Sequence, residues 1–266
     1  MVNQTTLNLP YDAGNAGDLL KHGFLAEFVR AWSKHYDKVI TYFDPFGGLP
    51  WHNLVNETVA ERVKKLRGTS LASAQPDIIQ KYYGSSFVML NSGKVFGNAI
   101  NAFVSDADEV HLELLRSANL QIINADGFHP TDGFSILDTK TSPDILLLDP
   151  YADFLPKRAT EVIPKLASFS DLTTIVLFVL NLNPANAVGR LYESLLHNYC
   201  HRGWLVKCPP LSKTSVRGES KYYVEIVIIP AANLSNEMTY NLFSNFTGYC
   251  QTLSTILDAE ITFGAI

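Results

Sequence analysis

Four aspartates each follow a short apolar run in this chain, and their side chains are the first candidates for chemistry. They are Asp44, Asp106, Asp126 and Asp149. The carboxyl ends of parallel strands meet at one edge of a sheet, and ligands of open α/β sheets bind beyond that edge. The four acids therefore predict a crevice lined with carboxylates, although a single aspartate in such a place is often only a helix cap.

The most informative of these strand ends is the segment 144–151, with the sequence DILLLDPY. Its apolar run is typical of a parallel strand that is buried on both faces. Asp149, Pro150 and Tyr151 follow the run, so the acid and the aromatic ring are expected to face the crevice. A carboxylate next to a flat ring suits a planar substrate that carries an amine, such as a nucleobase. A strand followed by a proline-containing turn would explain the same residues without any site.

A glycine turn follows the first of the predicted strands. Gly47 and Gly48 come just after Asp44, where residues without a Cβ let a cofactor approach the backbone closely. The turn lacks the GxGxxG spacing of dinucleotide-binding proteins, and an ordinary type II turn remains the alternative. Along the same edge, Asp106 could accept both hydroxyls of a ribose, and Asp126 could accept from an adenine amine.

A second cluster lies in the segment 13–22, AGNAGDLLKH. Asn15 or Asp18 could cap the helix that begins there. Lys21 and His22 lie one turn inside that helix, where the helix dipole does not favour cations. The pair is therefore expected to contact an acid or a ligand carboxylate, with a solvated helix face as the alternative.

The pattern of apolar residues predicts alternating helices and strands. Helices are expected over 18–36, 87–96, 110–117 and 185–201, and strands over 38–43, 99–104, 120–124, 145–148, 173–180, 204–207 and 222–229. Such alternation indicates one α/β domain over 1–266 with a doubly wound, mostly parallel sheet. The last two strands flank a polar connection, as in the C-terminal antiparallel hairpin of class I methyltransferases (a Rossmann-like fold). The polar segment 51–81 is expected to be a small inserted helical lobe without a strand.

Composition excludes several classes of protein. Hydrophobic residues make up 47% of the 266 residues, and the net charge of −5 does not indicate a nucleic-acid binder. The three cysteines form no CxxC pair, which is typical of reduced thiols in a cytoplasmic protein. Neither a signal peptide nor a membrane-spanning run is expected.

Other catalytic motifs are not found. His197 and His201 have helical i, i+4 spacing but no third ligand accompanies them, so no metal is expected. The chain has no GxSxG sequence, P-loop or Cys-His dyad, which argues against hydrolases and kinases.

Together these motifs resemble the RlmJ family, enzymes that use S-adenosylmethionine to methylate the N6 amine of an adenine in large-subunit ribosomal RNA. The resemblance covers about 11–230. It rests on AGN with Asp18 and LKH at 13–22, YFD at 42–44, YYGS at 82–85, ADGF at 125–128 and LDPY at 148–151.

The resemblance implies a role for each matching residue, with S-adenosylmethionine as the cofactor and RNA as the partner. Lys21, His22 and Ser85 would hold the methionine end of the cofactor, with Asp44 and Gly47 in the same site. Asp106 would bind the ribose and Asp126 with Gly127 the adenine ring. Asp149 would be the catalytic acid, with Pro150 and Tyr151 holding the target base.

The chain departs from the family in three places. The family has a second proline between the acid and the aromatic residue, whereas Pro150 stands alone here. Leu7 and Leu9 replace an aromatic residue and a histidine of the substrate clamp, and Phe46 replaces a histidine in the first turn. Two alternatives therefore remain open: a methyltransferase that acts on a substrate other than RNA, and a cofactor-binding module without turnover.

Overall fold

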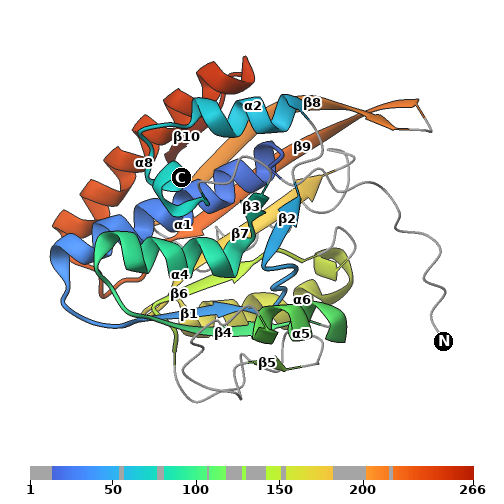
Figure 1. Ribbon diagram of the computed structural model, residues 1–266. Helices are drawn as coiled ribbons and strands as arrows, with labels where there is room; N and C mark the ends of the chain where they lie inside the picture. Colours follow the sequence, from blue (N-terminus) through green and yellow to red (C-terminus); the bar gives the residue numbers. More distant parts are fainter. Residues whose placement is uncertain are drawn as a thin grey trace.

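The fold is built on a large sheet of eight strands. The computed structural model describes residues 14–53, 57–76, 81–106, 108–117, 128–129, 142–150, 154–181, 202–215 and 218–266. The strand order is β10-β8-β9-β7-β6-β1-β4-β5, and β2 pairs with β3 in a separate small sheet (Figure 1). The strands are β1 (Ile40–Asp44), β2 (Trp51–Asn53), β3 (Lys81–Tyr83), β4 (Ile100–Ser105), β5 (Phe128–His129), β6 (Ile145–Leu148), β7 (Thr174–Asn181), β8 (Trp204–Ser215), β9 (Gly218–Ile229) and β10 (Thr262–Ala265).

The sheet has a parallel half and an antiparallel half. Strands β5, β4, β1, β6 and β7 run parallel to one another. Strands β9, β8 and β10 continue the sheet in antiparallel fashion from β7. A doubly wound parallel sheet that ends in an antiparallel hairpin is the class I methyltransferase arrangement, so the fold predicted from the sequence is confirmed.

Helices cover the sheet on both sides (Figure 1). They are α1 (Ala16–His35), α2 (Glu57–Lys65), α3 (Ser70–Ala74), α4 (Ser85–Phe96), α5 (Glu109–Ser117), α6 (Phe154–Phe169) and α8 (Asn236–Leu257). None of the helices in the described part of the chain has both the length and the apolar character that a membrane span requires.

Helix α1 lies in the middle of this arrangement and is buried along most of its length. Because it contacts the sheet as well as α3, α4 and α8, nearly every face of the helix needs small or apolar side chains. Two glycines permit the closest contacts: a Cβ at Gly23 would lie 2.1 Å from the Tyr249 ring, and one at Gly17 would lie 2.6 Å from the Phe178 ring. The helix that carries Lys21 and His22 is therefore fixed in place by packing.

Most of the expected elements are present, with shifts of a few residues at their ends. The expected strand at 120–124 and helix at 185–201 lie outside the described residues. The lobe at 51–81 contains α2 and α3 as expected, but the expectation that it has no strand is wrong, because β2 spans its first three residues. A strand of three residues is too short to produce a periodic signal. Helices α6 and α8 and strand β10 were not predicted.

Candidate active site

Three of the four predicted aspartates lie at one edge of the sheet. Asp44 ends β1, Asp106 directly follows β4 and Asp149 directly follows β6. Because β1 pairs in parallel with both β4 and β6, the three side chains meet at the same carboxyl edge. We call this edge the rim. Asp126, which the sequence places on the rim as well, lies outside the described residues.

Lys21 connects the first helix to the rim. Its ammonium forms an ion pair with Oδ2 of Asp149, a residue 128 positions away in the chain, and a second one with Oδ1 of Asp18 at 2.9 Å. The ammonium also lies 5.1 Å from the centre of the Phe178 ring. Asn15 caps the helix through the backbone N–H groups of Gly17 and Asp18. The expectation that the pair meets an acid is confirmed for Lys21, whereas the ring nitrogens of His22 contact hydroxyl groups.

Asp18 has a structural role beside this pair. Its Oδ2 accepts a hydrogen bond from the backbone N–H of Gly14 at 3.0 Å, while its Oδ1 faces Lys21. The side chains of Asp18 and Lys21 are only 3% and 6% exposed, whereas that of Asp149 is 22% exposed. Asp149 is therefore the most accessible member of the cluster.

His22 lies deeper, against β3 and the start of α4. Its Nδ1 lies 2.8 Å from the Tyr82 hydroxyl and its Nε2 lies 3.1 Å from the Ser85 hydroxyl. Burial, with a contribution from the charge of Lys21, lowers the pKa of His22 from 6.5 to about 3. His22 is therefore a neutral imidazole at pH 7, and it orients the hydroxyl of Ser85 by a hydrogen bond.

The carboxyl group of Asp44 is fully buried and has partners different from those of Asp149. Its Oδ2 accepts from the Tyr42 hydroxyl at 2.7 Å, and its Oδ1 accepts from the backbone N–H of Phe46 at 3.2 Å. Burial raises the pKa of Asp44 to about 7, although the bond from Tyr42 opposes the shift; the negative charge of Asp149 adds to it. Asp44 therefore changes its charge near neutral pH.

Burial also raises the pKa of Asp149 above its usual range. The ammonium of Lys21 opposes this shift through its charge and its hydrogen bond. The two carboxyl groups thus lie at one edge but differ in the group that opposes the rise in pKa caused by burial. This group is a hydroxyl for Asp44 and a cation for Asp149.

The glycine turn joins β1 to the end of β4. The N–H of Gly47 donates to the carbonyl of Ser105 at 2.8 Å, and a Cβ at Gly47 would lie 2.0 Å from a methyl group of Val104. Gly48 has a φ of +62°, and a Cβ there would meet no atom within 4 Å. Glycine is therefore needed at Gly47 for close packing, while the backbone of Gly48 borders open space.

Asp106 is held in place by the turn and by α5. Its Oδ2 accepts from the N–H of Gly48 at 2.9 Å and lies 3.0 Å from Nδ1 of His111, and its Oδ1 accepts from the N–H of Asp108 at 2.8 Å. The side chain of Asp106 remains 14% exposed. Its orientation is thus fixed before any ligand arrives.

The structure brings most of the predicted site residues together at the rim. Lys21, His22, Asp44, Gly47, Ser85, Asp106, Asp149 and the buried Pro150 all lie at or just behind the rim. Asp126, Gly127 and Tyr151 lie outside the described residues. No group of metal-binding side chains is found among the residues that the structure describes.

Some residues of the site were missed by the sequence analysis. Tyr42 precedes Asp44 by two positions on a strand, a spacing that places both side chains on one face and could have identified it. His111 follows Asp106 by five positions and lies in the first turn of α5, a spacing that gives no helical signal in the sequence. The contacts of Tyr82 and Phe178 depend on packing between distant segments and leave no signal in the sequence.

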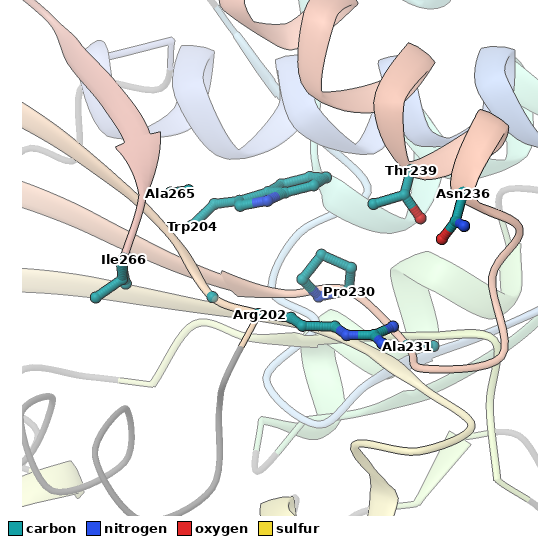
Figure 2. Close-up of a pocket in the computed structure, with 9 residues that line it drawn as sticks. Arg202, Trp204, Pro230, Ala231, Asn236, Thr239, Ala265 and Ile266 are labelled. Atoms are coloured by element: carbon teal, nitrogen blue, oxygen red, sulfur yellow. The ribbon is translucent and has the colours of Figure 1, made fainter.

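A cavity of about 280 Å³ lies elsewhere, where β8, β9, β10 and the start of α8 meet. Figure 2 shows Arg202, Trp204, Pro230, Asn236 and Thr239 around it. Since the end of β9 pairs with the start of β7, this cavity lies at the edge of the sheet opposite the rim. The chemistry of the predicted site residues is concentrated at the rim, and we place the active site there.

Comparisons with known proteins support the fold. No protein-family model and no curated protein matches the chain. Protein LPL1258 from Legionella pneumophila, described as DUF519, is 16% identical, with 95% of this chain and 98% of that chain covered and a TM-score of 0.62.

Two weaker structural matches are named methyltransferases. Precorrin-6y C5,15-methyltransferase from Geobacter metallireducens is 14% identical over 76% of this chain and 86% of that chain, with a TM-score of 0.39. A putative RNA methyltransferase from Pyrococcus horikoshii is 13% identical over 78% and 84%, with a TM-score of 0.38. At such low identities a structural likeness concerns the fold and does not assign an activity.

Proposed function

We propose that this protein is an S-adenosylmethionine-dependent methyltransferase that methylates the exocyclic N6 amine of an adenine in RNA. The observation that carries the proposal is the ion pair of Lys21 with Asp149 at the carboxyl edge of a class I methyltransferase sheet. It joins the residue proposed to anchor the cofactor to the residue proposed to receive the amine.

The residues of the rim fit this cofactor. Open space beside the backbone of Gly48 leaves room for a ligand next to the turn. The carboxylate of Asp149, which is partly exposed, favours a positive charge beside it, and a sulfonium is such a charge. Asp44 lies fully buried behind it at the same edge. Lys21 and Ser85 would bind the carboxylate of the methionine end, and the preoriented Asp106 would accept from the ribose hydroxyls. Asp126 and Gly127 remain proposed contacts of the adenine ring.

When bound, S-adenosylmethionine supplies a methyl group that is activated by the sulfonium. The residues of the chain then have to present the amine in line with that methyl group, so positioning provides much of the catalysis. The lone pair of an exocyclic adenine amine is delocalised into the ring. Hydrogen bonds from its N–H groups to Asp149 and to the carbonyl of Pro150 localise the lone pair on nitrogen.

Asp149 performs this role only when it is ionised. Burial works against ionisation of Asp149, and Lys21 opposes this effect by its positive charge. Lys21 contacts Oδ2, and no hydrogen bond within the described part of the chain reaches Oδ1. Oδ1 is therefore the oxygen that we assign to the amine, while Lys21 fixes the plane of the carboxylate and Tyr151 stacks on the target base.

A second candidate is a methyltransferase for a substrate other than RNA. The net charge of −5 favours it, because phosphate binding draws on basic side chains. A third candidate is a module that binds the cofactor but transfers no methyl group to any substrate.

Two measurements test the proposal. Calorimetry with S-adenosylmethionine and S-adenosylhomocysteine should give saturable heat, and its absence would contradict the cofactor assignment. Transfer of labelled methyl groups into RNA should occur with the native chain and with Asp171→Asn, an exposed aspartate at the opposite edge, but not with Asp149→Ala. We expect Asp106→Ala to weaken cofactor binding and Asp149→Ala to leave it nearly intact. Labelling of protein or small molecules in place of RNA would support the second candidate.

A further inference from the structure

The two short strands β2 and β3 present different side chains on their two faces. Their antiparallel register pairs Trp51 with Tyr83 and His52 with Tyr82. Because side chains alternate along a strand, His52 and Tyr82 share one face, and Tyr82 uses that face to contact His22. Trp51, Tyr83 and Lys81 share the other face.

This other face carries an aromatic cluster with a cation. The ring of Phe87, from the first turn of α4, packs edge-on against the ring of Trp51, with 5.8 Å between the ring centres. The centre of the Tyr83 ring lies 5.3 Å from that of Phe87. The ammonium of Lys81 lies 4.9 Å above the centre of the Trp51 ring. We call Trp51, Tyr83, Phe87 and Lys81 the Trp51 platform.

The platform is partly exposed. All four of its side chains are intermediate in exposure. Tyr83 and Phe87 pack against the hydrophobic core on one side, whereas Trp51 does not belong to the set of side chains packed on that core within the described residues. Core packing therefore explains two of the rings and leaves the indole of Trp51 unexplained.

The platform adjoins the proposed active site. Only six residues separate Asp44, at the end of β1, from Trp51, and Figure 1 shows β2 rising from that part of the molecule. The N–H of Gly84, next to Tyr83, donates to the carbonyl of Pro50 at 3.0 Å. This bond connects β3 to the end of the segment that leads from the rim to β2. A chain-like substrate that enters the rim would pass over this surface.

Lys81 is the basic residue of the platform, and the sequence segment that contains it is more basic than the chain as a whole. The segment 51–84 has five basic and three acidic side chains, whereas the whole chain has a net charge of −5. Aromatic rings that alternate with basic groups are how proteins bind single-stranded nucleic acid: bases stack on the rings and phosphates meet the cations. A double helix cannot use such a surface in this way, because its bases are already stacked.

We propose that the Trp51 platform binds the single-stranded RNA segment next to the target adenine, with a base stacked on Trp51 and a phosphate paired with Lys81. This inference rests on the proposed function, since it names how that substrate is held. The proposal adds a second substrate-binding surface beside the rim, on the face of β2 and β3 that carries Trp51, Tyr83 and Lys81.

Tryptophan fluorescence offers a direct measurement. The chain has three tryptophans, of which Trp32 and Trp204 are only 5% and 6% exposed. A base stacked on Trp51 should therefore quench the accessible part of the emission. We expect a short single-stranded RNA that contains adenine to quench the native protein, and Trp51→Phe to remove the quenching while keeping most of the affinity.

Substitutions separate stacking from charge. Trp51→Ala should weaken RNA binding about 5- to 160-fold, which corresponds to the 1–3 kcal/mol typical of one lost base stack. Lys81→Gln should lower the slope of log Kd against log salt by about 0.7, the value for one phosphate contact on a single strand. Matched controls are Tyr240→Ala, a 71% exposed aromatic residue on α8, and Lys94→Gln at the far end of α4; neither should change RNA binding.

The outcomes distinguish the platform from the proposed function. Equal RNA affinity of Trp51→Ala and the native protein, in an enzyme that transfers methyl groups to RNA, would overturn the platform and leave the activity standing. Equal affinity for a duplex of the same sequence would also overturn it. Calorimetry with S-adenosylhomocysteine should give the same Kd for Trp51→Ala and the native protein; a loss of cofactor affinity would indicate disturbed packing at the rim and would contradict the assignment of Trp51 to RNA.

Discussion

Asp44 and Asp149 lie at the ends of neighbouring strands of one sheet, yet their carboxyl groups differ in exposure and in the partner that each contacts. Asp44 is sealed from solvent, with a tyrosine hydroxyl as its side-chain partner and a pKa near 7. Asp149 is partly exposed and faces the ammonium of Lys21. The position at a strand end brings an acid to the rim, but its partner decides whether the acid is kept charged. Of the two, Asp149 is the one that combines access with a cation that favours its negative charge.

The largest expected effect follows from replacing the acid that we assign to catalysis. Asp149→Asn keeps the shape of the side chain but removes the charge that receives the amine. We expect the turnover number to fall about 10²- to 10⁴-fold, the usual contribution of such a group, while cofactor affinity measured by calorimetry stays within a few-fold. Turnover close to that of the native protein would contradict the assignment.

The pH dependence of stability should separate the two acids. The pKa of Asp44 is about 7 in the folded protein, above the ordinary value of 3.8 for an aspartate, so the folded state binds the proton more tightly than the unfolded state. The contribution of Asp44 to stability is therefore full at acidic pH and is lost as the pH rises through about 7.

Asp44→Asn removes this titration. Between pH 5 and pH 8, the free energy of unfolding of the native protein should fall relative to that of Asp44→Asn by up to about 3 kcal/mol, because each pKa unit corresponds to about 1.4 kcal/mol. Urea denaturation at both pH values measures it. The change in the free energy of unfolding between pH 5 and pH 8, relative to Asp149→Asn, should be smaller, since Lys21 opposes the rise in the pKa of Asp149. An equal change for the two acids would show that their partners do not distinguish them.

Removing the cation should make Asp149 more like Asp44. Lys21→Met leaves burial unopposed, so the pKa of Asp149 rises further and less of the carboxylate is ionised at pH 7. We expect kcat to fall several-fold at pH 7 because less of Asp149 is ionised, and the acidic limb of the pH–rate profile to move to higher pH.

Lys34→Met, an exposed lysine near the other end of the same helix, is the matched control and should keep the native profile. A uniform loss of rate at every pH in Lys21→Met would indicate that Lys21 only anchors the cofactor.

The smallest effect is expected from the hydroxyl that serves Asp44. Tyr42→Phe removes one buried hydrogen bond, at a cost of about 1 kcal/mol in the free energy of unfolding. Because that bond lowers the pKa of Asp44, its loss should also move the pH at which stability falls to a higher value. Denaturation curves of Tyr42→Phe across the same pH range test both points, and an unchanged pH dependence would show that Tyr42 does not act on Asp44.

The parts of the site that could be predicted are those that local patterns determine. Apolar runs that end in an acid predicted the rim, since parallel strands must end at a common edge. The ion pair of Lys21 with Asp149 joins residues 128 positions apart, and only the packing of α1 against the sheet creates it. Its other partner, Asp18, lies at helical i, i+3 spacing and was visible in the sequence, where it was considered only as a cap. Strand β2 escaped prediction because three residues give no periodic signal and their partners lie about thirty positions later in the chain.

The burial of α1 has a consequence for motion. A helix that is enclosed by the sheet and by α3, α4 and α8 cannot open without breaking the core. Its amide hydrogens between Leu19 and Phe28 should therefore exchange with deuterium only through global unfolding, as late as those of any strand. The ammonium that contacts Asp149 is thus carried by a rigid helix, and its position does not depend on a bound ligand.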